Sequence, residues 1–259
     1  MEHRAGGAVV HYVEHGAGRP VLVLHGAGVD HHEPEACFEP VFDRVTSFRR
    51  IYPDLPGMGR TVVPDELRSA EDVLTTLLDF AGEVTDGSAY LLIGHSAGAY
   101  YAQAMAARVP GRVAGLALVC PLLPSVRDVP EHRVAAGSGE FGDDAFRSYF
   151  VIQTREMLER YERYVAPAAA LVDQAALERI GERWELAPAL GPVYAGPTLV
   201  VAGRQDSVVG YAAATELVEH HPHASLAVLD DAGHALPHEQ PDLLRALVAD
   251  WLARVERSA

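Results

Sequence analysis

The chain has 259 residues, 49% of them apolar, which is the size and composition of a large globular unit with an ample core. Its formal net charge is −15, and all 21 basic residues are arginine. This acidity argues against nucleic acid or an anionic membrane as a partner. The absence of lysine from the sequence excludes Schiff-base and P-loop chemistry. The partner expected on these grounds is a small molecule.

The sequence shows no targeting or membrane pattern. Its apolar runs are shorter than a membrane span, and no basic-then-apolar signal segment opens the chain. Cys37 and Cys120 have neither metal nor redox spacing, which indicates reduced thiols. We therefore expect a cytoplasmic protein, and the sequence makes no prediction of its oligomeric state.

The first half of the chain alternates between β-prone and helical stretches. The predicted strands are residues 8–14, 21–24, 50–52, 90–93 and 112–120. The predicted helices lie near residues 36–45, 69–84 and 99–108. The strand at 8–14 is expected to be an antiparallel edge strand, whereas 21–24 is continuously apolar, as a strand buried on both faces should be. Ser69 and the acids after it are typical of a helix start.

Residues 122–195 differ in character from the rest of the chain. Helical stretches are predicted at 143–164 and 173–186, and no parallel-strand pattern is visible between them. This segment is predicted to be a helical cap inserted into the core. Most of its aromatic side chains are expected to pack within the cap. Phe146, Tyr149 and Phe150 are the candidates for contact with a bound ligand.

The β/α alternation resumes after residue 195. Strands are predicted at 197–202 and 225–229 and helices at 215–220 and 240–257, the last with Pro241 in its first turn. Strands that alternate with helices predict an α/β fold, a mainly parallel sheet covered on both faces. The predicted core is residues 1–121 and 196–259.

The segment Gly94-His95-Ser96-Ala97-Gly98 connects a predicted strand to a predicted helix. G-x-S-x-G in that setting is typical of a nucleophile elbow, a tight turn that presents the serine hydroxyl above the sheet. The flanking glycines remove side chains that would collide in such a turn. His95 is expected to pack beneath the elbow.

An acid and a base follow at the ends of later strands. Asp206 comes after the strand 197–202 and His234 after the strand 225–229, and in parallel sheets functional groups gather at these ends. Asp128 is an alternative acid, because a catalytic acid can move between strand ends. His238 falls at a helix start, where a capping or structural role is expected. Asp230 and Asp231 lie too close to the histidine loop to replace Asp206.

The loop after the strand 21–24 carries His25-Gly26-Ala27-Gly28 and then Asp30, His31, His32 and Glu33. These side chains could suggest a metal site, but adjacent histidines diverge and no further ligand spacing follows. We expect no metal here. Asp30 and His31 are predicted to line or support the mouth of a pocket, to which His25 and Val208 are also assigned.

Together these motifs resemble those of the α/β-hydrolase superfamily, in its serine-nucleophile branch. The resemblance rests on His25-Gly26-Ala27-Gly28, Asp54-Leu55-Pro56-Gly57-Met58-Gly59, the elbow, Gly203-Arg204-Gln205-Asp206 and Gly233-His234. It implies Ser96 as nucleophile, His234 as base and Asp206 as the acid that orients the histidine. It also implies that the backbone N–H groups of Ala27 and Ala97 bind the oxyanion.

The implied activity is hydrolysis of a carboxylic ester or lactone of a modest-sized, partly apolar substrate, without metal or cofactor. Ser96 argues against the dehalogenase and epoxide hydrolase branches, whose nucleophile is aspartate. The branch that cleaves C–C bonds usually has an aromatic residue after the histidine, where this chain has Ala235. Perhydrolase-like and enol-lactonase-like members have a similar layout. A non-catalytic ligand-binding relative is the remaining alternative, although it would not need all three triad residues.

Overall fold

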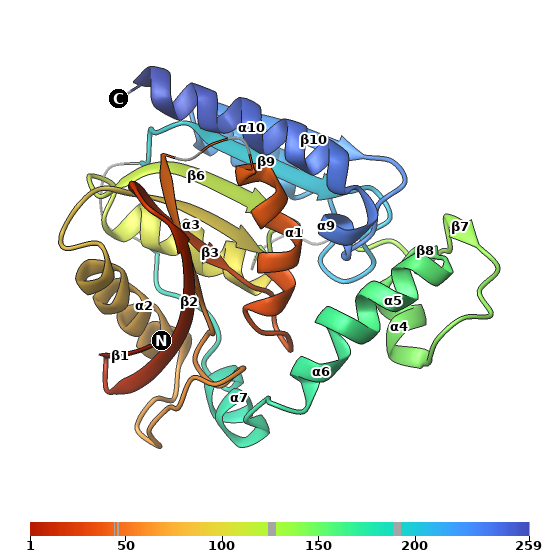
Figure 1. Ribbon diagram of the computed structural model, residues 1–259, viewed down its shortest axis with the longest axis horizontal. Coiled ribbons are helices and arrows are strands. Elements are labelled where there is room, and N and C mark those ends of the chain that lie inside the picture. Colours follow the sequence, from red (N-terminus) through yellow and green to blue (C-terminus); the bar gives the residue numbers. More distant parts are fainter. Residues whose placement is uncertain (44, 46, 124–127, 189–192, 259) are drawn as a thin grey trace.

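The centre of the molecule is an eight-stranded sheet in the order β1-β2-β4-β3-β5-β6-β9-β10 (Figure 1). The computed structural model describes residues 1–258 apart from 44, 46, 124–127 and 189–192. Neighbouring strands from β4 to β10 pair in parallel, so the predicted α/β fold is confirmed. The strands are β1 (Glu2–Ala5), β2 (Ala8–Gly16), β3 (Arg19–Leu24), β4 (Phe48–Pro53), β5 (Tyr90–His95), β6 (Val113–Val119), β9 (Thr198–Gly203) and β10 (Ala224–Leu229).

The strand predicted at the edge of the sheet is not at the edge. β2 pairs antiparallel with β4 on one side and with β1 on the other. Gly6 and Gly7, with φ of 53° and 82°, form a two-residue turn that folds Glu2–Ala5 back onto β2. Two glycines at positive φ favour this kind of hairpin, so the Gly-Gly pair is the pattern that could have indicated the extra strand, which was not predicted from the sequence.

Helices cover both faces of the sheet, as the alternation of side chains along β3 requires. Leu22 and Leu24 belong to one apolar cluster, with residues of α2 (Ala70–Val84), α3 (Ala97–Arg108) and α8 (Ala214–His220). Val21 and Val23 belong to the other, with residues of α1 (His32–Phe42) and α10 (Pro241–Ser258). Successive side chains of a strand point to opposite faces, so β3 is buried on both.

The starting residues of two helices are set by a capping side chain in one case and allow a proline in the other. α2 begins after Ser69, whose hydroxyl accepts a hydrogen bond from the N–H of Asp72 at 3.2 Å, as predicted for a capping residue. α1 begins at His32, earlier than the predicted start near residue 36. Pro34 lies in its first turn, where proline is tolerated because the N–H has no partner within the helix.

Between β6 and β9 the chain leaves the sheet, and we call residues 122–195 the insertion. Its elements are β7 (Ala136–Gly137), α4 (Asp144–Tyr149), β8 (Ile152–Gln153), α5 (Arg155–Tyr164), α6 (Ala166–Ala169) and α7 (Gln174–Gly181). α5 packs against α1 and against the short helix α9 (Leu236–Glu239) (Figure 1). The arrowheads of β6 and β9 point toward the side of the molecule where α4 and α5 lie. The insertion therefore meets the core near the carboxyl ends of the parallel strands.

The continuous helix predicted over 143–164 is interrupted. α4 ends at Tyr149 and α5 starts at Arg155, and between them Ile152–Gln153 forms a two-stranded parallel pair with Ala136–Gly137. Val151 and Ile152 are β-branched and favour extended backbone. The Gln153 amide nitrogen donates to the carbonyls of Arg147 and Phe150, at 2.9 and 3.0 Å, and so satisfies the end of α4. The Thr154 hydroxyl then caps α5.

Two global features concern membrane contact and cysteine chemistry. No helix in the described part of the chain is long and apolar enough to cross a membrane. Cys37 and Cys120 are both free and buried.

Candidate active site

Ser96 lies in the turn between β5 and α3, in a strained backbone conformation. Its φ of 53° and ψ of −115° are outside the regions that residues with a side chain ordinarily occupy. The turn closes only with glycine at both flanks. A Cβ at Gly94 would collide with the carbonyl oxygen of Gly98, and a Cβ at Gly98 would collide with that of Leu24. The sequence thus forces the hydroxyl of Ser96 to the first turn of α3.

The structure brings Ser96, His234 and Asp206 into one hydrogen-bonded chain. His234 Nε2 lies 2.9 Å from Ser96 Oγ, and His234 Nδ1 lies 2.8 Å from Asp206 Oδ2. Asp206 follows β9 and His234 follows β10, two adjacent parallel strands whose carboxyl ends meet at one edge of the sheet. All three residues are buried, with 8% of Ser96 and 6% of His234 exposed.

The charge on Asp206 fixes the tautomer of His234. Burial alone would raise the pKa of Asp206, but hydrogen bonding to His234 and to the N–H groups of Val208 and Val209 outweighs it and lowers the pKa. An ionised carboxylate only accepts, so His234 Nδ1 carries the proton and Nε2 presents its lone pair to the serine. The alternative acid, Asp128, is exposed.

The two amides expected to bind an oxyanion flank Ser96. Ala97 is the first residue of α3, and its N–H has no partner within the helix. Ala27 follows Gly26, and a Cβ at Gly26 would lie 3.4 Å from Ser96 Cβ, so this loop runs directly beside Ser96. Neither amide has a hydrogen-bond acceptor among the residues that the structure describes. Both are therefore free to donate to a ligand.

His25 supports this loop and does not line a pocket, contrary to the sequence prediction. It is fully buried, and its pKa is lowered by that burial. Its Nδ1 lies 2.7 Å from the Gly26 carbonyl oxygen, to which it donates, and its Nε2 accepts the N–H of Leu55 at 2.8 Å. Both ring nitrogens are occupied, so none remains for a substrate.

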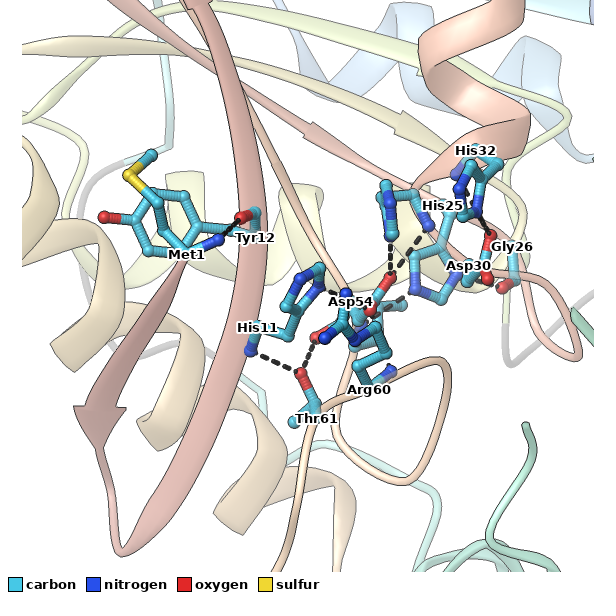
Figure 2. A network of polar contacts seen from close by, with 12 residues as sticks. Met1, His11, Tyr12, His25, Gly26, Asp30, His32, Asp54, Arg60 and Thr61 are labelled. Carbon is cyan, nitrogen blue, oxygen red and sulfur yellow. Dashed lines mark hydrogen bonds and ion pairs between the residues drawn. The ribbon is translucent and has the colours of Figure 1, made fainter.

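Asp30 and His31 also serve the loop, through the network shown in Figure 2. Asp54 is its centre: one oxygen accepts from the backbone and the ring of His31, both at 2.8 Å, and the other accepts from His11 Nδ1 at 3.0 Å and the Arg60 N–H at 2.8 Å. Asp30 accepts from the backbone and ring of His32. Asp30 and His31 are buried, and neither borders the groove described below.

Among the described residues, this network holds one of three groups of side chains whose ligand atoms lie close enough together for a metal ion; the others are Asp30, His31 and His32, and His95, Cys120 and His234. The ligand atoms of His11, His31 and Asp54 lie within 4.8 Å of one another. A carboxylate has about four acceptor positions, and Asp54 already uses them for four N–H groups. A cation would have to displace these bonds, so the donor set suits a structural anchor better than a metal site.

The pocket candidates from the insertion separate into two groups. Phe146 and Phe150 are fully buried and pack with Met157 and Tyr161 inside the insertion, so the prediction that they contact a ligand is wrong. Tyr149 instead lies with its ring edge toward His234, the ring centroids 6.0 Å apart.

Tyr149 and Val208 line one open groove. The groove has a volume of about 600 Å³ and is bordered by residues 129–132, Ser148 and Ser207 as well. Val208 is 46% exposed. Ser207 and Val208 directly follow Asp206, and Tyr149 contacts His234, so the groove lies beside these two residues.

Sequence reasoning missed a buried polar cluster behind His234. Glu33 Oε1 accepts the hydroxyl of Tyr149 at 2.9 Å and the Nε2–H of His238 at 3.2 Å. Burial opposes ionisation of Glu33, but these hydrogen bonds outweigh it and lower its pKa to about 2. Arg160 Nε donates to His238 Nδ1 at 3.1 Å. The pattern that could have indicated the cluster is the acid at 33, unusual on the buried face of an amphipathic helix.

His95 is buried next to Ser96, and it also holds the loop that carries His234. Burial lowers the pKa of His95 to about 4, so the ring is neutral. Its Nε2 lies 2.9 Å from the carbonyl oxygen of His234, and a carbonyl can only accept, so Nε2 carries the proton.

The fold is that of the α/β hydrolases, and comparison with known proteins agrees. The model of the alpha/beta hydrolase family matches residues 21–247, and the chain belongs to this family. It is similar to an alpha/beta superfamily hydrolase from Oenococcus oeni PSU-1, whose crystal structure superposes with a TM-score of 0.89 at 25% identity and covers 99% of both chains.

Two curated relatives cover almost the whole chain. Pimeloyl-[acyl-carrier protein] methyl ester esterase of Chromobacterium violaceum is 30% identical, over 90% of this chain and 94% of the relative. 2-Hydroxymuconate semialdehyde hydrolase of Pseudomonas sp. (strain CF600) is 27% identical, over 94% of this chain and 90% of the relative. The relatives are hydrolases, so the family relationship supports a hydrolytic enzyme in general.

Proposed function

We propose that the protein is a serine hydrolase that cleaves a carboxylic ester or lactone through an acyl-enzyme. The observation that carries this proposal is the chain of two hydrogen bonds that joins Ser96, His234 and Asp206, at 2.9 and 2.8 Å. A serine hydroxyl is a weak nucleophile until an adjacent base takes its proton. A base held in one tautomer by a buried carboxylate meets that need, and a binding protein would have no use for it.

In the proposed reaction, Ser96 Oγ attacks the carbonyl carbon while His234 Nε2 takes the hydroxyl proton. The carbonyl oxygen becomes an oxyanion and accepts hydrogen bonds from the N–H groups of Ala27 and Ala97. The tetrahedral intermediate collapses, the ester C–O bond breaks, and His234 gives its proton to the leaving alcohol. Water then attacks the acyl-enzyme and passes a proton to His234; the bond from the acyl carbon to Ser96 Oγ breaks, His234 returns the proton to Oγ, and the acid leaves. These steps require no metal or cofactor.

The groove beside Tyr149 and Val208 suits a small to medium, partly apolar substrate. Its volume of about 600 Å³ lies within the range of small-molecule sites. Val129, Pro130 and Val208 contribute apolar surface, and Glu131, His132 and Ser207 contribute polar groups. In this proposal the insertion acts as a cap, residues 122–195, on a core of residues 1–121 and 196–259.

Hydrolysis of a C–C bond is the second candidate. The similarity to 2-hydroxymuconate semialdehyde hydrolase favours it. Against it stands Ala235, which follows His234 and is fully buried against Phe146 and Phe150, where members of that branch usually have an aromatic residue. The esterase relative has the higher identity, 30% against 27%. We therefore place ester or lactone hydrolysis first.

The test is a panel of esters, lactones, amides and C–C ring-fission analogues, assayed with the wild type and with Ser96→Ala. Ser96→Ala should keep the fold and lower turnover by several orders of magnitude, as removal of a triad residue does elsewhere. A serine-directed phosphonate should label the wild type at Ser96 alone. Labelling of another serine, or undiminished turnover in the variant, would refute the assignment.

A further inference from the structure

The residue that precedes His234 is held by a buried glutamate. Glu239 lies in α9, and its Oε2 accepts the N–H of Gly233 at 2.7 Å. Only 6% of Glu239 is exposed. Burial raises the pKa of this carboxyl, and the N–H groups around it oppose that effect. A carboxylate is costly to bury, because it loses its hydration, and its hydrogen bonds to the protein must offset that free energy.

The other oxygen of the same carboxylate binds the insertion. Glu239 Oε1 accepts the N–H of Val151 at 2.7 Å and that of Ile152 at 3.1 Å. The Val151 side chain also packs onto the catalytic loop, since a Cβ at Gly233 would lie 2.7 Å from Val151 Cγ1. The backbone of the insertion and the residue before His234 thus share one side chain and one contact surface.

Further contacts act on His234 from the same two sides. Tyr149, two residues before Val151, places its ring edge against the ring of His234, and its hydroxyl is anchored on Glu33 of α1. From the core, His95 donates to the His234 carbonyl oxygen. The ring and the backbone of His234 are therefore enclosed by the insertion on one side and by the core on the other.

We propose that Glu239 is a positioning residue that makes the orientation of His234 depend on how the insertion is seated on the core. The proposal rests on the proposed function, because it concerns the base of that reaction. Glu239 suits this role because three N–H donors converge on its two oxygens. A glutamine has the same shape but only one acceptor oxygen, so its NH₂ group would face an N–H and break at least one side of the bridge.

The experiment compares Glu239→Gln with the wild type by the rate of phosphonate labelling at Ser96, well below the melting temperature of each protein. The labelling rate and kcat for an ester should fall together, by about 10- to 100-fold, because a base displaced by about 1 Å loses that much. Glu239→Asp keeps the charge but is one methylene too short to reach both partners, so it should fall as well. Glu39→Gln is the matched control.

Glu39, in α1, accepts hydrogen bonds from Arg50 and Tyr52 and, among the described residues, makes no hydrogen bond to the loop that carries His234. Its substitution should therefore lower the melting temperature and leave the labelling rate unchanged. Equal labelling rates in folded Glu239→Gln and wild type would overturn the proposal. Failure of both Glu239 variants to fold would also overturn it, because Glu239 would then be a folding determinant. A wild type that is not labelled at Ser96 would instead refute the proposed function, and this inference with it.

Discussion

At the level of single residues, hydrogen bonds distinguish Asp206, the acid of the proposed triad, from its alternative. Asp206 is fully buried, yet its pKa is lowered, because His234 and two backbone N–H groups stabilise the charged form more than burial destabilises it. Asp128, the alternative by sequence, is exposed. Asp206 and Asp128 both follow a strand, but the first is buried and hydrogen-bonded and the second is exposed to solvent.

Asp206→Asn should reduce turnover on the order of 10⁴-fold, because an amide favours the wrong tautomer of His234. Asp128→Asn, the matched control, should change turnover less than about twofold, as expected for an exposed residue without a role in the reaction. Steady-state kinetics on one ester checks both. The reverse pattern would place the acid on the earlier strand.

At the scale of elements, Asp54 joins three segments that are far apart in sequence. Its carboxylate binds β2 through His11, the start of α1 through His31, and the following loop through Arg60 (Figure 2). The N–H of Leu55, the next residue, donates to His25 Nε2. This bond connects the Asp54 network to the loop that contains Ala27. The oxyanion amide of the proposed mechanism thus depends on a carboxylate outside the triad.

Asp54→Asn should lower the free energy of unfolding at pH 7 by about 3–5 kcal/mol, as loss of one partner of a buried pair does. Burial opposes the charge of Asp54, but His31 and the backbone N–H groups lower its pKa below the ordinary value. Because the pKa of Asp54 is lower in the folded than in the unfolded protein, its ionised form stabilises the folded state above about pH 4. This contribution to stability is lost as the pH falls. Measured by urea unfolding across pH 2–7, the free-energy difference between wild type and variant should therefore shrink progressively as the pH falls below about 4.

The control for this experiment is Asp65→Asn, since the side chain of Asp65 is 89% exposed. Its unfolding free energy should follow that of the wild type at every pH. A difference between Asp54→Asn and the wild type that does not shrink between pH 4 and pH 2 would contradict the assigned direction of the pKa shift.

At the scale of the whole molecule, the groove between the insertion and the loop after Asp206 should decide substrate size. Val208→Phe narrows the groove and should shift preference toward shorter acyl or alcohol chains, by about 10-fold in relative kcat/KM, since a methylene or two in an apolar pocket is worth about 1–3 kcal/mol. An ester series of increasing chain length provides the measurement. An unchanged profile would separate the groove from substrate recognition.

Phe146→Ala is the control on the insertion. Phe146 is fully buried among aromatic side chains of α4 and α5, so its truncation should cost about 3–5 kcal/mol of stability. The substrate profile of the folded variant should not change. A changed profile would show that the interior of the insertion also shapes the groove.

The sequence by itself determined the features that depend on near neighbours along the chain. Continuous apolar runs such as 21–24 predicted buried strands, Ser69 predicted a helix start, and two glycines around Ser96 predicted a tight strand-to-helix turn, because each pattern is local. The order of Ser96, Asp206 and His234, each beyond a predicted strand, was enough to select them as candidates. The family resemblance then predicted the fold that the structure and the comparisons confirm.

The tertiary structure alone decided which side chains meet across long distances in the sequence. Phe146 and Tyr149 lie on the same short helix, yet one is interior and the other contacts His234, because the seating of α4 on the core sets their directions. The bond from Tyr149 to Glu33 and the bridge from Glu239 to Val151 join residues 116 and 88 positions apart. Hydrophobic periodicity carries no information about such polar pairs, since they form only where packing buries a carboxylate beside donors that water no longer reaches.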